Sequence, residues 1–164
     1  MIRFWGERVV YRSVLRLLAT AVSSPELLLA PSERRRIPSA ESRSRDGAAA
    51  EDLAAVYLAL RGYRILCRHR VNSLGELDIV ARKGRTLVLV EVRSRRAGSP
   101  VSARNTLTAA KRRRLAGCAE LFRREHGLVA LPWRIDLLAV EFPAKGMPRV
   151  AEHLVDCIGD QGRP

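Results

Sequence analysis

The chain has 164 residues and contains 30 Lys and Arg against 17 Asp and Glu, which gives a formal net charge of +13. This length suits one ordinary domain with an extension, and 47% hydrophobic residues argue against a wholly disordered chain. The positive surplus favours a polyanionic partner, either nucleic acid or an anionic membrane surface. No stretch reaches the ~18 uninterrupted apolar residues of a membrane span, so we expect no transmembrane segment.

The three cysteines lie far apart in the sequence, at Cys67, Cys118 and Cys157. They form no CxxC motif and have no histidine at metal-ligand spacing. This pattern indicates free thiols in a reducing compartment. We therefore expect a cytoplasmic protein with neither a disulfide framework nor a zinc site.

Residues 1–45 differ in character from the rest of the chain. They hold nine Arg and four Asp or Glu, and residues 32–45 have the polar, charged composition of a linker. Residues 2–22 fit a basic amphipathic helix, which would bind a membrane surface or act as an arm for a polyanion. A dispensable tail is the interpretation that we favour. We expect a basic extension over residues 1–45, a domain over 46–142 and a tail over 143–164.

The domain is expected to begin with a helix. Asp46 is placed to cap it and Gly62 to end it. Its apolar positions follow the helical period at Leu53, Val56, Tyr57 and Leu60.

Strand patterns follow this first helix. They cover residues 63–71, 76–82 and 86–93, and a Gly84-Arg85 turn joins the last two strands. A Gly/Ser/Pro loop over 97–105 precedes a second helix over 106–126 and a final strand over 133–142. The second helix is expected to bury Leu115, Cys118, Ala119 and Phe122. The order helix, three strands, helix, strand predicts an α/β domain.

Acidic residues interrupt both strands of the central hairpin. If residues 84–85 form a two-residue turn, Asp78 lies opposite Glu91 and Glu76 opposite Arg93, all on one face of the sheet. A three-residue loop would place Asp78 and Glu91 on opposite faces. The position of these side chains is therefore a sharp structural prediction.

Two carboxylates that meet on a half-buried sheet repel each other unless a cation lies between them. Mg²⁺ or Mn²⁺ would fill this role and would stabilise the charge that grows on a phosphate under attack. The alternative is a surface ion pair between Glu76 and Arg93, with Asp78 as a polar residue at the strand edge. From the residues alone, this alternative is the simpler interpretation.

The segments GELDIVA and LVLVEVRSR resemble the YraN family of uncharacterised bacterial proteins. The family pattern in turn resembles PD-(D/E)xK nucleases of the restriction-endonuclease-like fold, including archaeal Holliday-junction resolvases. The similarity extends over about residues 47–142. It implies that the domain is a restriction-endonuclease-like core with a basic N-terminal extension.

The resemblance also implies roles for individual residues. Asp78 and Glu91 would bind the metal, and the backbone carbonyl of Val92 would be a third ligand. Glu51, on the first helix, corresponds to an acidic residue that completes the site in resolvase-like members.

The sequence departs from the family pattern at Arg93, where a lysine is expected. Arginine keeps its proton and cannot act as a base, so cleavage is in question while phosphate binding is not. Lys111 is a candidate replacement, since it lies one turn before Leu115 on the buried stripe. The alternative for Lys111 is a lysine that extends into solvent beside a core helix.

Residues 93–114 contain eight basic residues and no acidic one, which equals the whole surplus of the domain. Outside this stretch we expect the domain to be neutral on balance. Such a one-signed run fits contacts with a phosphate backbone. Few aromatic residues are available for stacking, so duplex or branched DNA is a better partner than single strands. Besides Arg93 and Lys111, the candidate nucleic-acid-binding residues are Arg95, Arg96, Arg104, Arg112, Arg113 and Arg114.

Asp136 is expected to pair with Arg134 or to support the metal ligands, and the three histidines show no partner spacing. The leading hypothesis is a DNA-binding protein of nuclease type that hydrolyses phosphodiesters with Mg²⁺ or Mn²⁺. A DNA-binding relative without catalysis is the first alternative, because of Arg93. The second is a basic ribosome- or assembly-associated protein in which the acidic residues are only structural.

Overall fold

The computed structural model describes residues 45–99 and 102–158. The predicted α/β class and the predicted order of elements are confirmed, and a fifth strand, which the sequence pattern did not predict, follows within residues 143–164. The extension over residues 1–45 lies outside the described residues except for Arg45. The elements are α2 (Arg45–Leu60), β1 (Arg64–Asn72), β2 (Gly75–Lys83), β3 (Thr86–Arg96), the 3-10 turn η4 (Ala103–Thr106), α3 (Ala109–Glu125), β4 (Trp133–Phe142) and β5 (Arg149–Leu154).

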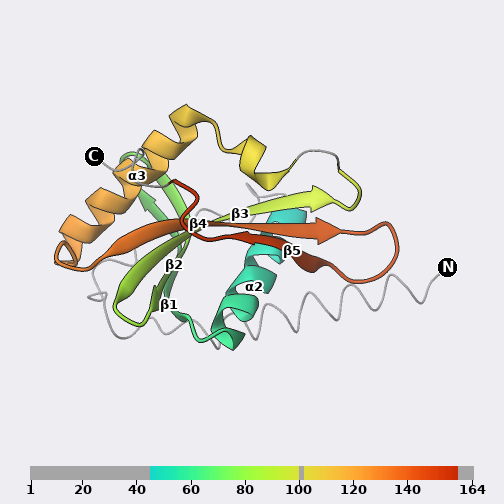
Figure 1. The fold of residues 1–164 in the computed structure, drawn as a ribbon, viewed down its shortest axis with the longest axis horizontal. Coiled ribbons are helices and arrows are strands. Elements are labelled where there is room, and N and C mark those ends of the chain that lie inside the picture. Colours follow the sequence, from blue (N-terminus) through green and yellow to red (C-terminus); the bar gives the residue numbers. More distant parts are fainter. Residues whose placement is uncertain (1–44, 100–101, 159–164) are drawn as a thin grey trace.

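The five strands form one mixed sheet in the order β1-β2-β3-β4-β5. β3 and β4 run parallel and are connected through α3, whereas the other neighbours are antiparallel. α2 and α3 cover opposite faces of the sheet (Figure 1). Among the described residues, no helix is long and apolar enough to cross a membrane.

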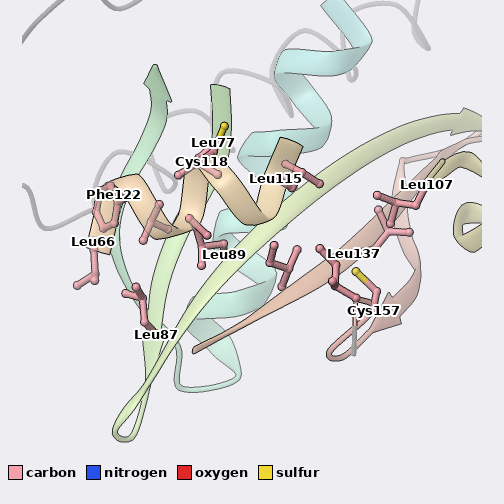
Figure 2. Close-up of a cluster of buried hydrophobic side chains, with 14 of the residues drawn as sticks. Leu66, Leu77, Leu87, Leu89, Leu107, Leu115, Cys118, Phe122, Leu137 and Cys157 are labelled. Carbon is pink, nitrogen blue, oxygen red and sulfur yellow. The ribbon is translucent and has the colours of Figure 1, made fainter. Parts of the chain in front are cut away.

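The apolar stripe of α3 packs on its face of the sheet as predicted. Cys118, Ala119 and Phe122 are almost fully buried, and Phe122 lies with Leu66 and Leu87 at one end of this cluster (Figure 2). All three cysteines of the chain are free thiols, in agreement with their spacing. The amphipathic pattern therefore predicted the side of α3 that faces the core.

The apolar face predicted for the first helix is confirmed in part: Leu53, Val56 and Tyr57 of α2 pack against the core, whereas Leu60 does not. Leu60 is 81% exposed, and the residues that α2 buries most deeply are Ala50, Ala54 and Leu58, together with Ala55. Small alanine side chains allow the helix backbone to approach the sheet closely, so the larger predicted residues come to lie at the margins of this contact. Likewise, the predicted capping aspartate lies inside the first turn of α2, which begins one residue earlier.

The central hairpin has the predicted two-residue turn. Lys83 pairs with Thr86, and the ladder continues in this register to Ile79 and Val90. Gly84 occupies the first turn position with a φ of 58°, a left-handed conformation that favours glycine. The turn therefore sets the register of every side chain in the two strands.

Candidate functional site

The candidate site lies where β2 and β3 separate. Their ladder ends at Ile79 and Val90, and the next residues are Asp78 and Glu91. The backbone N–H of Val92 donates a hydrogen bond to Oδ2 of Asp78 (2.8 Å), so the aspartate joins the two strands where the ladder stops. The negative charge of Glu91 acts on Asp78, so the two carboxylates lie close together. Strict alternation along β2 is interrupted at Asp78, because Leu77 and Val80 both belong to the cluster under α3. The proximity of the carboxylates agrees with the predicted register, although Asp78 and Glu91 are not themselves a ladder pair.

The register does not extend to the next predicted pair. Glu76 pairs with Val71 of β1, and Arg93 pairs with Ala139 of β4, so the predicted Glu76–Arg93 contact is wrong. Beyond the end of their ladder, β2 stays with β1 and β3 stays with β4, which pulls the two residues apart. The simple alternative of a surface ion pair between Glu76 and Arg93 is thereby removed.

Glu91 is the most deeply buried carboxylate of the site, with 4% of its surface exposed. Two cations neutralise it. Nζ of Lys111 lies 2.6 Å from Oε1 of Glu91, and Nη2 of Arg93 lies 3.3 Å from the same oxygen. Lys111 belongs to the first turn of α3, where Thr108 caps the helix. The structure thus brings a lysine from a helix to the carboxylates of the sheet.

Among the described residues, no cation forms an ion pair with Asp78 as Lys111 and Arg93 do with Glu91. Burial, together with the negative charges of Glu91 and Glu51, raises the pKa of Asp78 to about 8. The hydrogen bond from Val92 and the charge of Lys111 act in the opposite direction but do not cancel this effect. The ionised form of Asp78 is therefore disfavoured, and a bound cation would stabilise it.

Glu51 reaches the site from α2 and meets a histidine that the sequence analysis did not assign. Oε2 of Glu51 lies 2.8 Å from Nδ1 of His69, and Oε1 of Glu76 lies 3.7 Å from the same nitrogen. Arg68 pairs with Ile79 and Arg70 with Leu77, so His69 of β1 lies opposite Asp78 of β2. Its φ of 54° is rare for a histidine within a strand. No local sequence signal identifies this contact, which joins segments far apart in the chain.

The donor set fits a hard divalent cation that keeps most of its water. Within residues 45–99 and 102–158, no group of three or more His, Cys, Asp or Glu side chains is arranged to hold a metal ion. Asp78 and Glu91 offer two carboxylates, and Mg²⁺ is commonly held by one or two carboxylates with water and phosphate oxygens. Glu51 contacts His69, so these two carboxylates form the core of the candidate site.

Comparison with known proteins supports the family suggested by the motifs. The sequence model of the uncharacterised protein family UPF0102 matches residues 50–140. The chain belongs to UPF0102, the YraN family. A UPF0102 protein of Roseiflexus castenholzii is 42% identical over 113 residues, which cover 68% of this chain and 91% of the relative. One from Anaeromyxobacter dehalogenans is 40% identical over 124 residues, covering 76% and 91% of the two chains.

The UPF0102 match includes every residue of the candidate site. Glu51, Asp78, Glu91 and Lys111 all fall between residues 50 and 140, whereas β5 lies beyond this span. The part of the chain that defines the family is therefore the part that builds the carboxylate cluster.

The basic residues of this UPF0102 chain have different surroundings. Arg95 is bound by Glu141 at 2.8 Å, and its other amino group lies 3.8 Å from Glu152. Arg112 donates through Nε to the carbonyl of Leu107 (3.2 Å). The side chain of Arg104 lies outside the described part of the structure. Arg96, Arg113 and Arg114 are exposed and make no ion pair with a described residue.

Asp136 forms a separate buried cluster that connects β4 with β5. It accepts hydrogen bonds from Arg134 (2.9 Å) and from the backbone of Asp156 (2.9 Å), and His153 lies 3.1 Å away, so its expected pairing with Arg134 is confirmed. Burial alone would raise the pKa of Asp136, but these partners outweigh burial and hold the pKa below its usual value. These contacts give Asp136 a structural role.

Thr108 provides a test of how Lys111 is positioned. Its Oγ1 accepts a hydrogen bond from the backbone N–H of Lys111 (3.2 Å), so Thr108→Ala is expected to lower the free energy of unfolding by about 1 kcal/mol. Urea unfolding would measure this loss. Thr108→Ser keeps the hydroxyl and serves as the control, and an equal loss in both variants would contradict a capping role.

Proposed function

We propose that this chain binds DNA and hydrolyses its phosphodiester bonds with Mg²⁺ or Mn²⁺. The observation that carries this proposal is the contact of Lys111 with Glu91 beside Asp78. This contact brings a lysine to the two carboxylates at one point of the sheet. The family pattern has a lysine at the position of Arg93, so Lys111 would replace it. The mixed sheet with a helix on each face is compatible with the restriction-endonuclease-like core that the motifs suggest.

The ligand set would consist of Asp78, Glu91 and the backbone carbonyl of Val92. A divalent cation held by these atoms supplies positive charge where a phosphate under attack becomes more negative. The chain's own residues set up this position in advance. Lys111 and Arg93 hold Glu91 in place, and the Val92 N–H holds Asp78, so little rearrangement would be needed on binding.

Arg93 is suited to binding a phosphate. One amino group faces Glu91, and 31% of the Arg93 side chain is exposed, so part of the guanidinium is accessible to a ligand. The guanidinium therefore has donors left for phosphate oxygens, which it can engage in pairs. Because arginine keeps its proton, Arg93 would clamp the phosphate, and Lys111 would provide the point charge close to the carboxylates.

The phosphate backbone on either side of the site would be bound by the exposed Arg96, Arg113 and Arg114. Such contacts are insensitive to base sequence and sensitive to salt. Of the five aromatic residues in the described part of the chain, Tyr63 and Phe122 are buried, and Tyr57, Trp133 and Phe142 are partly buried. Duplex or branched DNA therefore suits this surface better than an unstacked single strand.

A second candidate function is DNA binding without cleavage. It is favoured by Arg93, which cannot replace the expected lysine as a base, and by the ion pair that already engages Lys111. In this case the carboxylates would hold a cation that anchors a phosphate, and the strand would remain intact.

Incubation of the purified protein with branched, duplex and single-stranded DNA tests the proposal. We expect cleavage of branched or duplex DNA with Mg²⁺ or Mn²⁺ and a loss of about 100-fold or more in Glu91→Gln. Binding would be followed by fluorescence anisotropy with Ca²⁺ in place of Mg²⁺. The charge reversal Arg113→Glu/Arg114→Glu is expected to weaken binding, whereas Glu91→Gln should retain it.

The outcomes separate the candidates. Binding without cleavage in every metal supports the second candidate function. If the protein binds none of these DNA forms at low salt, both candidates are wrong.

A further inference from the structure

We propose that a second set of basic residues, at the opposite end of β2 from Asp78, binds the phosphate backbone of the same nucleic acid. This inference rests on the proposed function and adds a second contact surface to it. The residues come from the α2–β1 connection, the start of β1 and the β2–β3 turn. They are Arg61, Arg64, Arg82, Lys83 and Arg85, which we call the turn cluster.

Contacts within the fold bring the turn cluster together. Arg64 and Arg82 are directly paired across β1 and β2, and Lys83 donates a hydrogen bond from Nζ to the backbone carbonyl of Arg61. Arg85 occupies the turn two residues after Lys83. All five side chains are exposed. Three separate segments thus gather basic side chains around one end of the sheet, with Arg64 and Arg82 toward the α3 side and Lys83 beside Tyr63 on the α2 side.

The turn cluster lacks the carboxylates that accompany other arginines of the same region. Arg68 donates to Asp52 at 2.5 Å, and Arg70 lies 3.3 Å from Glu125. By contrast, none of the five residues of the turn cluster forms an ion pair within the described part of the chain. The Arg64–Arg82 pair also places like charges opposite each other, which destabilises a sheet. Such a cluster is best matched by a polyanion that neutralises all five charges.

Some of these side chains are held in place before any ligand binds. The guanidinium of Arg61 lies 3.6 Å from the ring centroid of Tyr57, and Nζ of Lys83 lies 4.9 Å from that of Tyr63. Cation–π contacts of this kind restrict the long side chains, so less conformational entropy is lost on binding.

The spacing along β2 relates the turn cluster to the carboxylates. Asp78 and Arg82 are four residues apart on one strand, which separates them by about 13 Å at ~3.3 Å per residue. This corresponds to about four base pairs of B-form DNA at ~3.4 Å per pair. A duplex with one phosphate at Asp78 would therefore reach Arg82 with a phosphate less than half a helical turn away.

The double variant Arg64→Gln/Arg82→Gln tests this inference, with binding to a DNA duplex measured by anisotropy over a range of salt concentrations. We expect the slope of log K against log salt to become about 2 units shallower and the affinity at low salt to fall about tenfold or more. The melting temperature should equal or exceed that of the wild type, because the like-charged pair is removed.

The control is Arg124→Gln/Arg149→Gln, which changes the net charge equally. Arg124 and Arg149 are exposed arginines that pair with Glu120 and Glu141, respectively. We expect this control to keep the wild-type slope. An unchanged slope in Arg64→Gln/Arg82→Gln, or an equal change in both double variants, would overturn the second surface and leave the proposed function standing. A wild-type protein that does not bind DNA would instead overturn the proposed function itself.

Discussion

Asp78→Asn is expected to make the metal-free protein more stable while abolishing metal-dependent cleavage. The reason is that the folded state disfavours the ionised carboxylate. Asp78 is partly buried beside Glu91 and near Glu51, and the two cations of the site contact Glu91. Asparagine has nearly the same shape and an oxygen that can accept the Val92 hydrogen bond, but it carries no charge.

The effect should depend on pH. The pKa of Asp78 rises from 3.8 to about 8 on folding, so between these values the folded state binds a proton that the unfolded state has released. Stability of the metal-free wild type must therefore decrease as pH rises through this window. Each pKa unit corresponds to ~1.4 kcal/mol, and allowing for relaxation we expect Asp78→Asn to gain on the order of 3 kcal/mol near pH 8 and almost nothing near pH 4.

Urea unfolding between pH 4 and pH 8, with and without Mg²⁺, measures this gain. Mg²⁺ should stabilise the wild type at the upper end of this window and leave Asp78→Asn unchanged, because only the carboxylate attracts the cation. Asp52→Asn is the matched control, since Asp52 is paired with Arg68 and its neutralisation should not stabilise the protein. An Asp78→Asn variant that is less stable than the wild type at pH 8, or that still responds to Mg²⁺, would contradict this account.

The local patterns of the sequence predicted most of the fold. The Gly84-Arg85 turn fixed the register that places Asp78 and Glu91 together, because a two-residue hairpin leaves no freedom in strand pairing. The final strand was predicted with the bounds Trp133–Phe142 that the structure shows. Each of these predictions depends on residues that are neighbours in the chain.

What the sequence did not predict depends on contacts between distant segments. The three apolar residues of β5 follow no strict strand alternation, and the strand is defined by its pairing with β4. The contact of His69 with Glu51 requires both the left-handed backbone of His69 and the docking of α2. The face of α2 was predicted only in part, because the period of its large residues does not show that alanines make the closest approach to the sheet.

The distribution of charge on the surface also depends on contacts between distant segments. Over the whole domain, the residues outside 93–114 balance, and the sequence analysis therefore identified no second basic surface. In the structure, Asp52 and Glu125 pair with Arg68 and Arg70, and no described carboxylate forms an ion pair with the turn cluster. A net charge of zero over a stretch of sequence thus does not imply a neutral surface.

Lys111→Met is expected to reduce cleavage by about 100- to 1,000-fold while leaving the fold intact. Nζ of Lys111 lies 2.6 Å from the carboxylate of Glu91, so its removal leaves Arg93 as the cation beside that buried group. Methionine retains the apolar stem that packs beside the core of α3. The loss should appear in kcat, because the charge of Lys111 acts where negative charge increases during the reaction.

Arg93→Lys separates the two positions at which a lysine could act. If Lys111 has taken over the role of the lysine expected at position 93, Arg93→Lys should cleave about as fast as the wild type. Combined with Lys111→Met, Arg93→Lys should restore much of the lost activity, because a lysine on β3 beside Glu91 would then occupy the position of the family pattern. Single-turnover cleavage measured for the four proteins would decide this. Cleavage that appears only in proteins with Arg93→Lys would show that the wild-type chain binds DNA without cutting it. If Lys111→Met cleaves as fast as the wild type, Lys111 takes no part in the reaction. Its ion pair with Glu91 would then only stabilise the fold, so the substitution would lower the unfolding free energy and leave kcat unchanged.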